Sequence, residues 1–476
     1  MMPVQDRVHS PPQFPQRRTT RLPLAATRAG IPTGALEVTA ATGAAPGILA
    51  NAFMRRARAL LWAGLLCATA VSPVLAQDVA LGSSVQSLLV YARTQSPELN
   101  AMRQEAEAAA QRIGPAGALP DPVLRVELMN INNYGRDAPP SILPWRVGET
   151  KYTLMQAFPL WGKRDLRRDA AAADAKQADA RTDSTWAELA ARIKRAYAEY
   201  YRAAGNERLV GELLALMTQL EQVAQARYAG GLVGQPDAIR AQLEQTVMRA
   251  ELISLDGEKR QIRAKLNGLL ARDGAAALAE PVALRPLPSL GAADAVSLAE
   301  RARMRNPQIM VELARLAAAQ KNRDLTHANR YPDLLVGLSP SQMGSRITTW
   351  SLMFEMNIPL QQESRRGQER EAAAMVNAAR SRADNLSNRV LGELGANLAG
   401  LDAARRTEIL IKSQLLPQAE LSLQSSLAAY ANGKAEFAVL IEAQRQILKA
   451  RQELLKSRVE AQLRLADIES LLGEDL

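Results

Sequence analysis

The sequence predicts a mainly helical chain that also contributes β-strands to a membrane barrel. Three observations support this fold class: motifs that recur about 200 residues apart, four short segments that alternate apolar and polar residues, and long uninterrupted helical segments. The 476 residues are 47% hydrophobic and only 4% aromatic. This composition excludes collagen, a low-complexity tail and a disulfide scaffold.

The first 76 residues are expected to be absent from the folded protein. Residues 54–76 contain three arginines, an apolar run too short to span a membrane, and small or apolar residues before Gln77, which is the order of a secretory signal peptide. Residues 1–53 precede it and are rich in proline and alanine, so they are either a misassigned start upstream of Met54 or an extended leader. Cys67 lies in the apolar run after Leu66, where a lipoprotein signal requires a small residue, so lipidation is not expected.

Charge and residue usage argue against nucleic-acid binding and catalysis. Lysine and arginine number 59 against 49 acidic residues, but residues 1–76 contain eight arginines and only two acids. The remaining charges are mixed and form no basic face of the kind that binds nucleic acid. One cysteine and two histidines, His9 and His327, build no metal cluster or nucleophile. We therefore expect no enzyme activity, no cofactor and no metal site.

The mature chain is predicted to contain two copies of one unit. Five motifs recur in the same order, from Ser87-Leu88 and Ser297-Leu298 to Ala241-Gln242 and Ala443-Gln444. The expected repeats are residues 77–274 and 294–476, joined by a linker at 275–293 that is rich in proline and alanine. Each repeat is predicted to run helix, two strands, long helix, turn, long helix.

The strands are expected at about 119–131, 150–159, 333–339 and 348–359, in two hairpins with loops at 132–149 and 339–347. The strongest alternation, in the last strand, gives it one fully apolar face. Such faces are typical of strands that cross an outer membrane. The side chains expected to face lipid are Leu124, Val126, Leu128, Trp350, Leu352, Phe354, Met356 and Ile358.

The long helices exceed the needs of a globular domain. No proline occurs from Trp161 to Gln235, and a helix reaching Arg227 would be about 100 Å long. In the last helix, Leu440, Ile447 and Leu454 keep a seven-residue spacing that predicts a coiled-coil seam. Pro417 predicts a kink or break in the preceding helix.

Four strands cannot close a barrel, and an open edge in lipid leaves backbone groups unpaired. The barrel must therefore be shared between chains. Two chains would give a small plugged barrel, and three would give twelve strands around an aqueous passage.

These features resemble the TolC-like outer-membrane factors of tripartite efflux and type I secretion systems. The resemblance covers the mature chain and is most specific in the duplication, in the segment Phe158-Pro159-Leu160-Trp161-Gly162-Lys163-Arg164, and in the paired turns at 227–234 and 430–434. It implies a homotrimer with a twelve-stranded barrel in the outer membrane and a helical tunnel in the periplasm. It also implies two partners, a periplasmic adaptor and an inner-membrane pump of the resistance-nodulation-division type.

In the TolC-like family the adaptor docks at the turns between the long helices. The corresponding residues are Arg227, Tyr228, Gly230, Gly231, Tyr430, Asn432 and Gly433. The glycines suit the left-handed conformation that follows a helix, which alone would explain them. The family closes its tunnel just past the turns, so Asp237, Tyr430 and Glu442 are candidate gate residues, with Tyr430 as the partner of Asp237. Val439 departs from the acidic constriction pattern, and either acid is also explained as a helix-start residue.

The sequence thus predicts an outer-membrane channel that conducts substrates passively from adaptor and pump to the exterior. The segment Pro159–Arg164 resembles the heavy-metal branch of this family, which implies heavy-metal cations as substrates, with small toxic compounds as the other substrate class. Methionines near the strands suit soft Cu(I), but they are also ordinary apolar fillers. The alternatives are a channel for type I protein secretion and a periplasmic helical adaptor without a pore.

Overall fold

The computed structural model describes residues 81–131, 139–231, 234–289 and 294–476. The expected leader and signal peptide, with His9 and Cys67, lie outside these residues. The first repeat contains α2 (Val85–Gln95), α3 (Pro97–Gln111), α4 (Ile113–Ala116), β1 (Val123–Met129), β2 (Glu149–Phe158), α5 (Lys163–Ala229) and α6 (Gln235–Leu269). The second contains α7 (Asp294–Arg305), α8 (Pro307–Ala328), β3 (Leu334–Met343), β4 (Arg346–Met356), α9 (Gln362–Leu410), η1 (Ile411–Leu415), α10 (Leu416–Ala431) and α11 (Phe437–Leu472).

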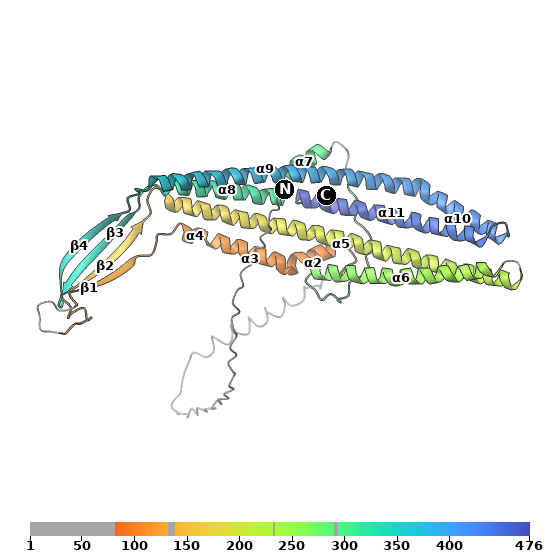
Figure 1. Cartoon of the computed structure of the whole chain (residues 1–476), viewed down its shortest axis with the longest axis horizontal. Helices are drawn as coiled ribbons and strands as arrows, with labels where there is room; N and C mark the ends of the chain where they lie inside the picture. The colour runs from red at the N-terminus through yellow and green to blue at the C-terminus, as the bar shows by residue number, and fades with distance from the viewer. Residues whose placement is uncertain (1–80, 132–138, 232–233, 290–293) are drawn as a thin grey trace, which may run out of the picture. The chain divides into compact units, whose positions relative to one another are not determined.

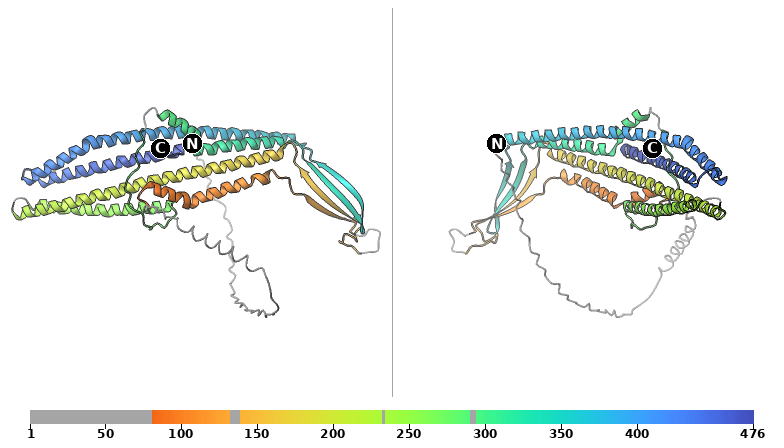
Figure 2. Two further views of the ribbon diagram at one scale, coloured as in Figure 1. Left: turned by 180° about the vertical axis from the view of Figure 1, so that it is seen from behind. Right: turned by 45° about the vertical axis from the view of Figure 1, so that its right-hand side comes forward.

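This order confirms the mainly helical, duplicated fold class. The four strands lie at one end of the long helices, and the turns α5–α6 and α10–α11 lie at the other (Figure 1). We call these two turns, with the adjoining helix ends, the tip. Helix α5 packs against α6, α8 and α11, so it contacts both repeats along its length. The same end-to-end arrangement is visible from behind and after a turn of 45° (Figure 2).

The strands form one antiparallel sheet in the order β1-β2-β3-β4. Pairing of β2 with β3 joins the two repeats. Leu124 pairs with Leu154, Leu154 with Leu338, and Leu338 with Leu352, so one leucine from each strand forms a row across the sheet. Because directly paired residues point to the same face, the register places these leucines together on one face, which is mainly apolar.

The opposite face of the sheet carries several small, polar side chains. Thr153 and Ser339 are both buried there, and the Ser339 hydroxyl donates to the Thr153 hydroxyl at 2.9 Å. In the next row Gly337 lies between Met155 and Met353, and a Cβ at Gly337 would meet the Met353 methyl group at 2.9 Å. These methionines therefore fill space over a glycine.

The expected loop at 339–347 is wrong. Strand β3 continues to Met343, β4 begins at Arg346, and only Gly344 and Ser345 connect them. Gly344 has φ 63°, a left-handed conformation that suits a two-residue hairpin turn. Ser339 and Ser341 resemble loop residues in sequence, but they belong to the buried polar face of the strand.

Helix α5 has 67 residues, which corresponds to about 100 Å. The expected break at Pro417 is present as a π turn, η1, between α9 and α10. Proline lacks a backbone N–H, and its ring crowds the carbonyl four residues earlier, here that of Ser413. Widening the preceding turn relieves this conflict, whereas α5 continues without interruption through Ala215.

The cores are narrow seams between helices. One seam joins α2, α5 and α6, a second joins α7, α8, α9 and α11, and a third lies near the tip between α5, α6, α10 and α11. In the predicted coiled-coil seam Leu440 and Ile447 are buried and Leu454 is half-buried. Among the described residues, we find no helix with an apolar stretch long enough to cross a membrane.

Candidate functional site

The turn after α10 ends the helix with a complete Schellman motif. The amide of Gly433 donates to the Tyr430 carbonyl at 3.0 Å, and the amide of Lys434 donates to the Ala429 carbonyl at 2.8 Å. The first turn has the bond that corresponds to the one between Gly433 and Tyr430: the amide of Gly231 donates to the Tyr228 carbonyl at 2.9 Å. The described parts of the two turns therefore have the same local geometry.

Gly231 and Gly433 both have φ 70°, in the left-handed region that glycine adopts without strain. Gly230 does not share this role, because its φ is −81° and it matches Asn432, with φ −86°. The expectation that every tip glycine is left-handed is therefore wrong for Gly230. Only one glycine in each turn is required by backbone conformation.

The two tip tyrosines differ although they hold equivalent positions in the repeats. Tyr228 is 47% exposed, whereas Tyr430 is only 3% exposed. The Tyr430 ring contacts the Phe437 ring, with centroids 5.3 Å apart at 60°. Tyr430 is thus part of the tip core, and Tyr228 remains available at the surface.

Arg227 connects the two helical hairpins of the tip. Its side chain, at the end of α5, donates a hydrogen bond to the backbone carbonyl of Tyr430 on α10. Its guanidinium carbon also lies 4.9 Å from the centre of the Tyr430 ring, a cation–π arrangement. The sequence predicts a docking role for Arg227 and no contact with Tyr430. The available signal was the contrast with Ala429, its equivalent in the second repeat.

Within one chain, Tyr430 and Asp237 form no hydrogen bond through the Tyr430 hydroxyl. The Tyr430 hydroxyl is buried without a hydrogen-bond partner among the described residues. Burial raises the pKa of this hydroxyl above 10.0, the nearby Asp237 carboxylate adds to the increase, and the Arg227 guanidinium opposes it. Asp237 therefore acts on Tyr430 through charge alone.

The other candidate gate residue, Glu442, is exposed on α11 and accepts a hydrogen bond from Gln446 at 3.3 Å. Val439 is also exposed, at 51%. Glu442 and Val439 therefore lie at the surface of the single chain, outside the core cluster that contains Tyr430. The structure brings together Arg227, Tyr430 and the charge of Asp237, and it leaves Glu442 at the surface.

Polar side chains also lie within the tip. Glu244 on α6 forms an ion pair with Arg445 on α11, and Glu221 on α5 accepts a hydrogen bond from Gln245. Gln444 is 1% exposed, and neither end of its amide has a hydrogen-bond partner among the described residues. Gln444 was noted in the sequence only as a repeat match, since its burial depends on tertiary packing.

The side chains expected to face lipid follow the register of the sheet. Leu124, Val126, Leu128, Trp350, Leu352, Phe354 and Met356 occupy the apolar face, and Ile358 lies beyond the end of β4. Phe354 is 66% exposed and Trp350 is 63% exposed. Their contact with lipid remains a prediction.

A compact joint links the sheet to the helices. Trp161 and Gly162 both have positive φ, at 62° and 70°, so the chain turns sharply between β2 and α5. The Trp161 ring stacks on Tyr331 with centroids 5.0 Å apart, and its indole N–H donates to the Pro332 carbonyl at 3.0 Å. Lys163, which is buried, donates to the Tyr331 carbonyl and to Asp333 at 2.7 and 2.8 Å. These bonds hold a strained tryptophan conformation and tie the first repeat to the second.

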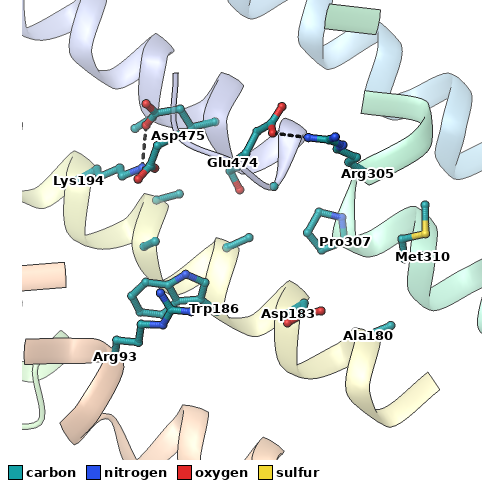
Figure 3. A pocket seen from close by; sticks show the side chains of 17 residues that line it. Arg93, Ala180, Asp183, Trp186, Lys194, Arg305, Pro307, Met310, Glu474 and Asp475 are labelled. Carbon is teal, nitrogen blue, oxygen red and sulfur yellow. Dashed lines mark hydrogen bonds and ion pairs between the residues drawn. The ribbon is translucent and has the colours of Figure 1, made fainter. Parts of the chain in front are cut away.

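A cavity of 420 Å³ lies between the two repeats, lined mainly by residues of α5, α8 and α11 and by residues 473–475 (Figure 3). Lys194 on α5 reaches across to Glu469 at 2.7 Å and also pairs with Asp475. Arg285 in the linker forms two hydrogen bonds with Glu469, at 3.0 and 2.8 Å. The buried charges at this cavity are therefore paired with one another, and they fasten the repeats and the linker together.

The described residues contain no group of three or more histidine, cysteine, aspartate or glutamate side chains arranged to hold a metal ion.

Known proteins resemble the chain in both sequence and fold. The model of the family described as outer membrane efflux protein matches residues 88–272 and 298–474. No curated protein compared with the chain matches it. Among solved structures, the outer membrane protein VceC from Vibrio cholerae is 20% identical, with a TM-score of 0.69 over 82% of this chain and 96% of that one.

Two further structures show the same fold. A membrane protein from Pseudomonas aeruginosa is 20% identical, with a TM-score of 0.70 over 83% of this chain and 91% of that one. The open state of the outer membrane channel MtrE from Neisseria gonorrhoeae is 16% identical, with a TM-score of 0.68 over 83% and 90%. The family model matches most of the chain, in two segments that together span both pairs of long helices. The chain therefore belongs to the outer membrane efflux protein family, as its resemblance to TolC-like factors predicted.

Proposed function

We propose that three copies of the chain form a passive outer-membrane channel of a tripartite efflux system. The observation that carries this proposal is the row of four exposed leucines, one from each strand, on an open sheet. Within the described residues, no strand pairs with the outer edge of β1 or of β4. Three such sheets supply twelve strands, which closes the edges and leaves an aqueous passage. The small polar face then lines the passage.

The helices extend this passage into the periplasm. Six long helical hairpins, two from each chain, form the tunnel wall, and the tip lies about 100 Å from the sheet. A periplasmic adaptor docks at the tip residues Arg227, Tyr228, Gly230, Gly231, Asn432 and Gly433. An inner-membrane pump of the resistance-nodulation-division type supplies the energy, and this chain supplies the exit.

Asp237 and Glu442 are proposed to line the gate. Three copies of each acid would favour cations near the constriction through their combined field. Asp237→Asn with Glu442→Gln should therefore lower the cation preference of the channel, measured as the reversal potential in a salt gradient across a planar bilayer. An unchanged reversal potential would exclude both acids from the constriction.

Heavy-metal cations are the proposed substrate class, with small toxic compounds as the alternative. This choice rests on the resemblance of the segment Pro159–Arg164 to the heavy-metal branch of the family. In the structure the same segment forms the joint between the sheet and the helices. Deletion of the gene should raise sensitivity to copper, silver, zinc and cadmium salts, and the intact chain should restore growth. Sensitivity only to dyes and antibiotics would assign the channel to small toxic compounds. Loss of a secreted protein without any change in sensitivity would assign it to type I secretion.

A further inference from the structure

A second hollow, which we call the arginine groove, lies among the long helices on the half nearer the sheet. It has a volume of 490 Å³ and is lined by side chains of α3, α5, α8 and α9. Arg181 on α5 and Arg382 and Arg389 on α9 line it, and Glu312 on α8 is the one acid in its described lining. Arg315 lies 3.7 Å from one oxygen of Glu312, and the other oxygen is buried. The groove therefore carries an excess of positive charge.

Two of the three arginines have no counter-charge of their own. Within the part of the chain that the structure describes, the side chains of Arg181 and Arg382 form no ion pair and no hydrogen bond. Arg389 pairs with Glu393 at 3.8 Å, and both of these side chains are exposed. The guanidinium groups of the groove are therefore available to an added anion.

The neighbouring hollow, which shares Gln308 with the arginine groove, shows the opposite pattern. There Arg192 pairs with Glu98 and Arg195 pairs with Asp467, each at 2.9 Å. Close pairing within the chain is thus possible for arginines on α5, and the arginine groove departs from it. A free guanidinium presents its N–H donors in a planar fork that matches the oxygens of carboxylate, sulfonate and phosphate groups.

The arginine groove also has apolar lining, from Met102 on α3, Val311 on α8 and Leu386 on α9. These three side chains are buried or half-buried, whereas the three arginines are exposed. The apolar side chains therefore form the floor of the groove, and the arginines form its rim. An amphipathic organic anion fits both parts, because its apolar body covers the floor while its charged oxygens accept hydrogen bonds from the rim. An inorganic anion would leave the floor uncovered.

The arginine groove and the cavity of Figure 3 lie on opposite faces of the same pair of helices. Asp183 on α5 and Met310 on α8 line the cavity. Arg181 and Val311, at the same level of the same two helices, line the groove. The two hollows share no residue, and two packed helices have only two open faces. Because Arg93 of α2 lines the cavity, α2 lies on the face away from the groove.

The place of the groove in the channel rests on the proposed trimer. In a ring of three chains, one face of the long helices borders the passage and the other borders the periplasm. Three copies of α2 on the inner face would obstruct the passage, so α2 lies outside and the groove inside. We propose that the arginine groove is a binding site for amphipathic organic anions on the wall of the passage. The site gives a chemical character to the small toxic compounds, the second substrate class, and an open groove suits a channel because the cargo must also leave.

Binding of naphthalene-2-sulfonate to the purified trimer tests the site. The trimer is held in lipid nanodiscs, and binding is measured by equilibrium dialysis with protein-free nanodiscs as the blank. Arg181→Gln together with Arg382→Gln should weaken binding roughly tenfold or more, because charge-assisted hydrogen bonds to the sulfonate are lost. Inorganic sulfate should bind more weakly than naphthalene-2-sulfonate, and a naphthyl trimethylammonium cation should not bind above the blank.

Arg380→Gln is the matched control. Arg380 is an exposed arginine on α9 that does not line the groove, and it lies two residues from Arg382, which is about half a turn around the helix. This variant should bind naphthalene-2-sulfonate like the parent, since it removes the same charge from the other side of the helix.

Single-channel recording tests whether the site borders the passage. Naphthalene-2-sulfonate should interrupt the current of the parent briefly, and the double variant should shorten these interruptions roughly tenfold, in line with its weaker binding. Arg380→Gln should leave them unchanged.

Equal affinity in the double variant and the parent would overturn the site. Sulfate that binds as tightly as naphthalene-2-sulfonate would also overturn it, since the apolar floor would contribute nothing. If the double variant fails to assemble while Arg380→Gln assembles, the two arginines are required for folding and the proposal falls. Binding that depends on the arginines but never interrupts a flowing current would place the groove outside the passage and overturn the proposal. A parent trimer that binds naphthalene-2-sulfonate and carries no current would contradict the proposed channel and leave the anion site intact.

Discussion

At the scale of single residues, the backbone of the tip depends on two glycines. Gly231 and Gly433 have φ 70°, and a Cβ there costs about 1–2 kcal/mol. Gly231→Ala and Gly433→Ala should leave the protein in the outer membrane but reduce export, because only the docking end is distorted. Export is measured as resistance of a complemented deletion strain, with membrane fractionation as the assembly check.

Gly230→Ala is the matched control for this prediction. Gly230 has φ −81°, a conformation open to any residue, so the variant should export like the parent. Equal loss of export in all three variants would mean that the tip requires small size at these positions. Normal export in all three would mean that the tip turns do not take part in docking.

Tyr430 makes the tip sensitive to alkaline pH. Its pKa is raised above 10.0, chiefly by burial, because the folded tip accommodates the neutral hydroxyl better than the phenolate, and this pH-dependent contribution to stability is fully present below pH 10. This contribution is lost as the pH rises through the folded pKa, when a buried phenolate would face the Asp237 carboxylate. The distance between spin labels attached at the exposed positions Ala226 and Ala431 should therefore lengthen above pH 10, and Tyr430→Phe should abolish the change. Persistence of the change in Tyr430→Phe would assign it to another group.

At the scale of elements, strand β4 tests which face of the sheet meets lipid. Phe354 lies on the apolar face and Ser351 on the opposite one. Phe354→Arg should impair assembly, since an arginine on the lipid face near the bilayer midplane costs about 2–4 kcal/mol. Ser351→Arg should assemble normally, because its side chain enters the aqueous passage. Assembly is measured as the amount of trimer recovered from outer membranes. Equal recovery of the two variants would show that the lipid-facing and passage-facing sides of β4 are assigned wrongly.

Sequence periodicity was sufficient to predict the elements that depend on local pattern. The apolar face of β4, the length of α5 and the break at Pro417 follow from alternation, composition and proline geometry, all of which are readable along the chain. The end of β3 was missed, since Ser339 and Ser341 belong to the strand only because β2 and β4 pair with it on both sides.

The site was predicted less completely than the elements. The positions of the tip turns were readable from the repeat, as was the need for glycine at Gly231 and Gly433. The link from Arg227 to the Tyr430 carbonyl and the burial of Gln444 depend on how two hairpins pack, and no local pattern encodes that contact. Differences between equivalent repeat positions are the sequence signal that points to such residues.

At the scale of the whole molecule, Glu469 fastens the two repeats together. It is almost fully buried and pairs with Lys194 from the first repeat and with Arg285 from the linker. Glu469→Gln should destabilise the protein by about 3 kcal/mol, because it leaves buried cations undercompensated. The midpoint of urea unfolding, followed by helical circular dichroism, measures this loss. Glu460→Gln on the same helix breaks only an exposed pair with Arg464 and should cost less than about 1 kcal/mol.

Removal of the signal peptide and formation of the trimer also concern the whole molecule. We expect the mature protein to begin near Gln77 and to fractionate with outer membranes as a heat-modifiable trimer. N-terminal mass spectrometry and native electrophoresis check this prediction. A chain that retains residues 1–76, or a soluble monomer, would contradict it.

The central claim is that three copies of this chain form an aqueous channel through the outer membrane. Single-channel recording of the purified mature protein in a planar bilayer tests it most directly. The account predicts discrete, uniform current steps from a preparation that is trimeric, with loss of these steps in Phe354→Arg and their retention in Ser351→Arg. A folded trimer that inserts into the bilayer and carries no current would contradict it.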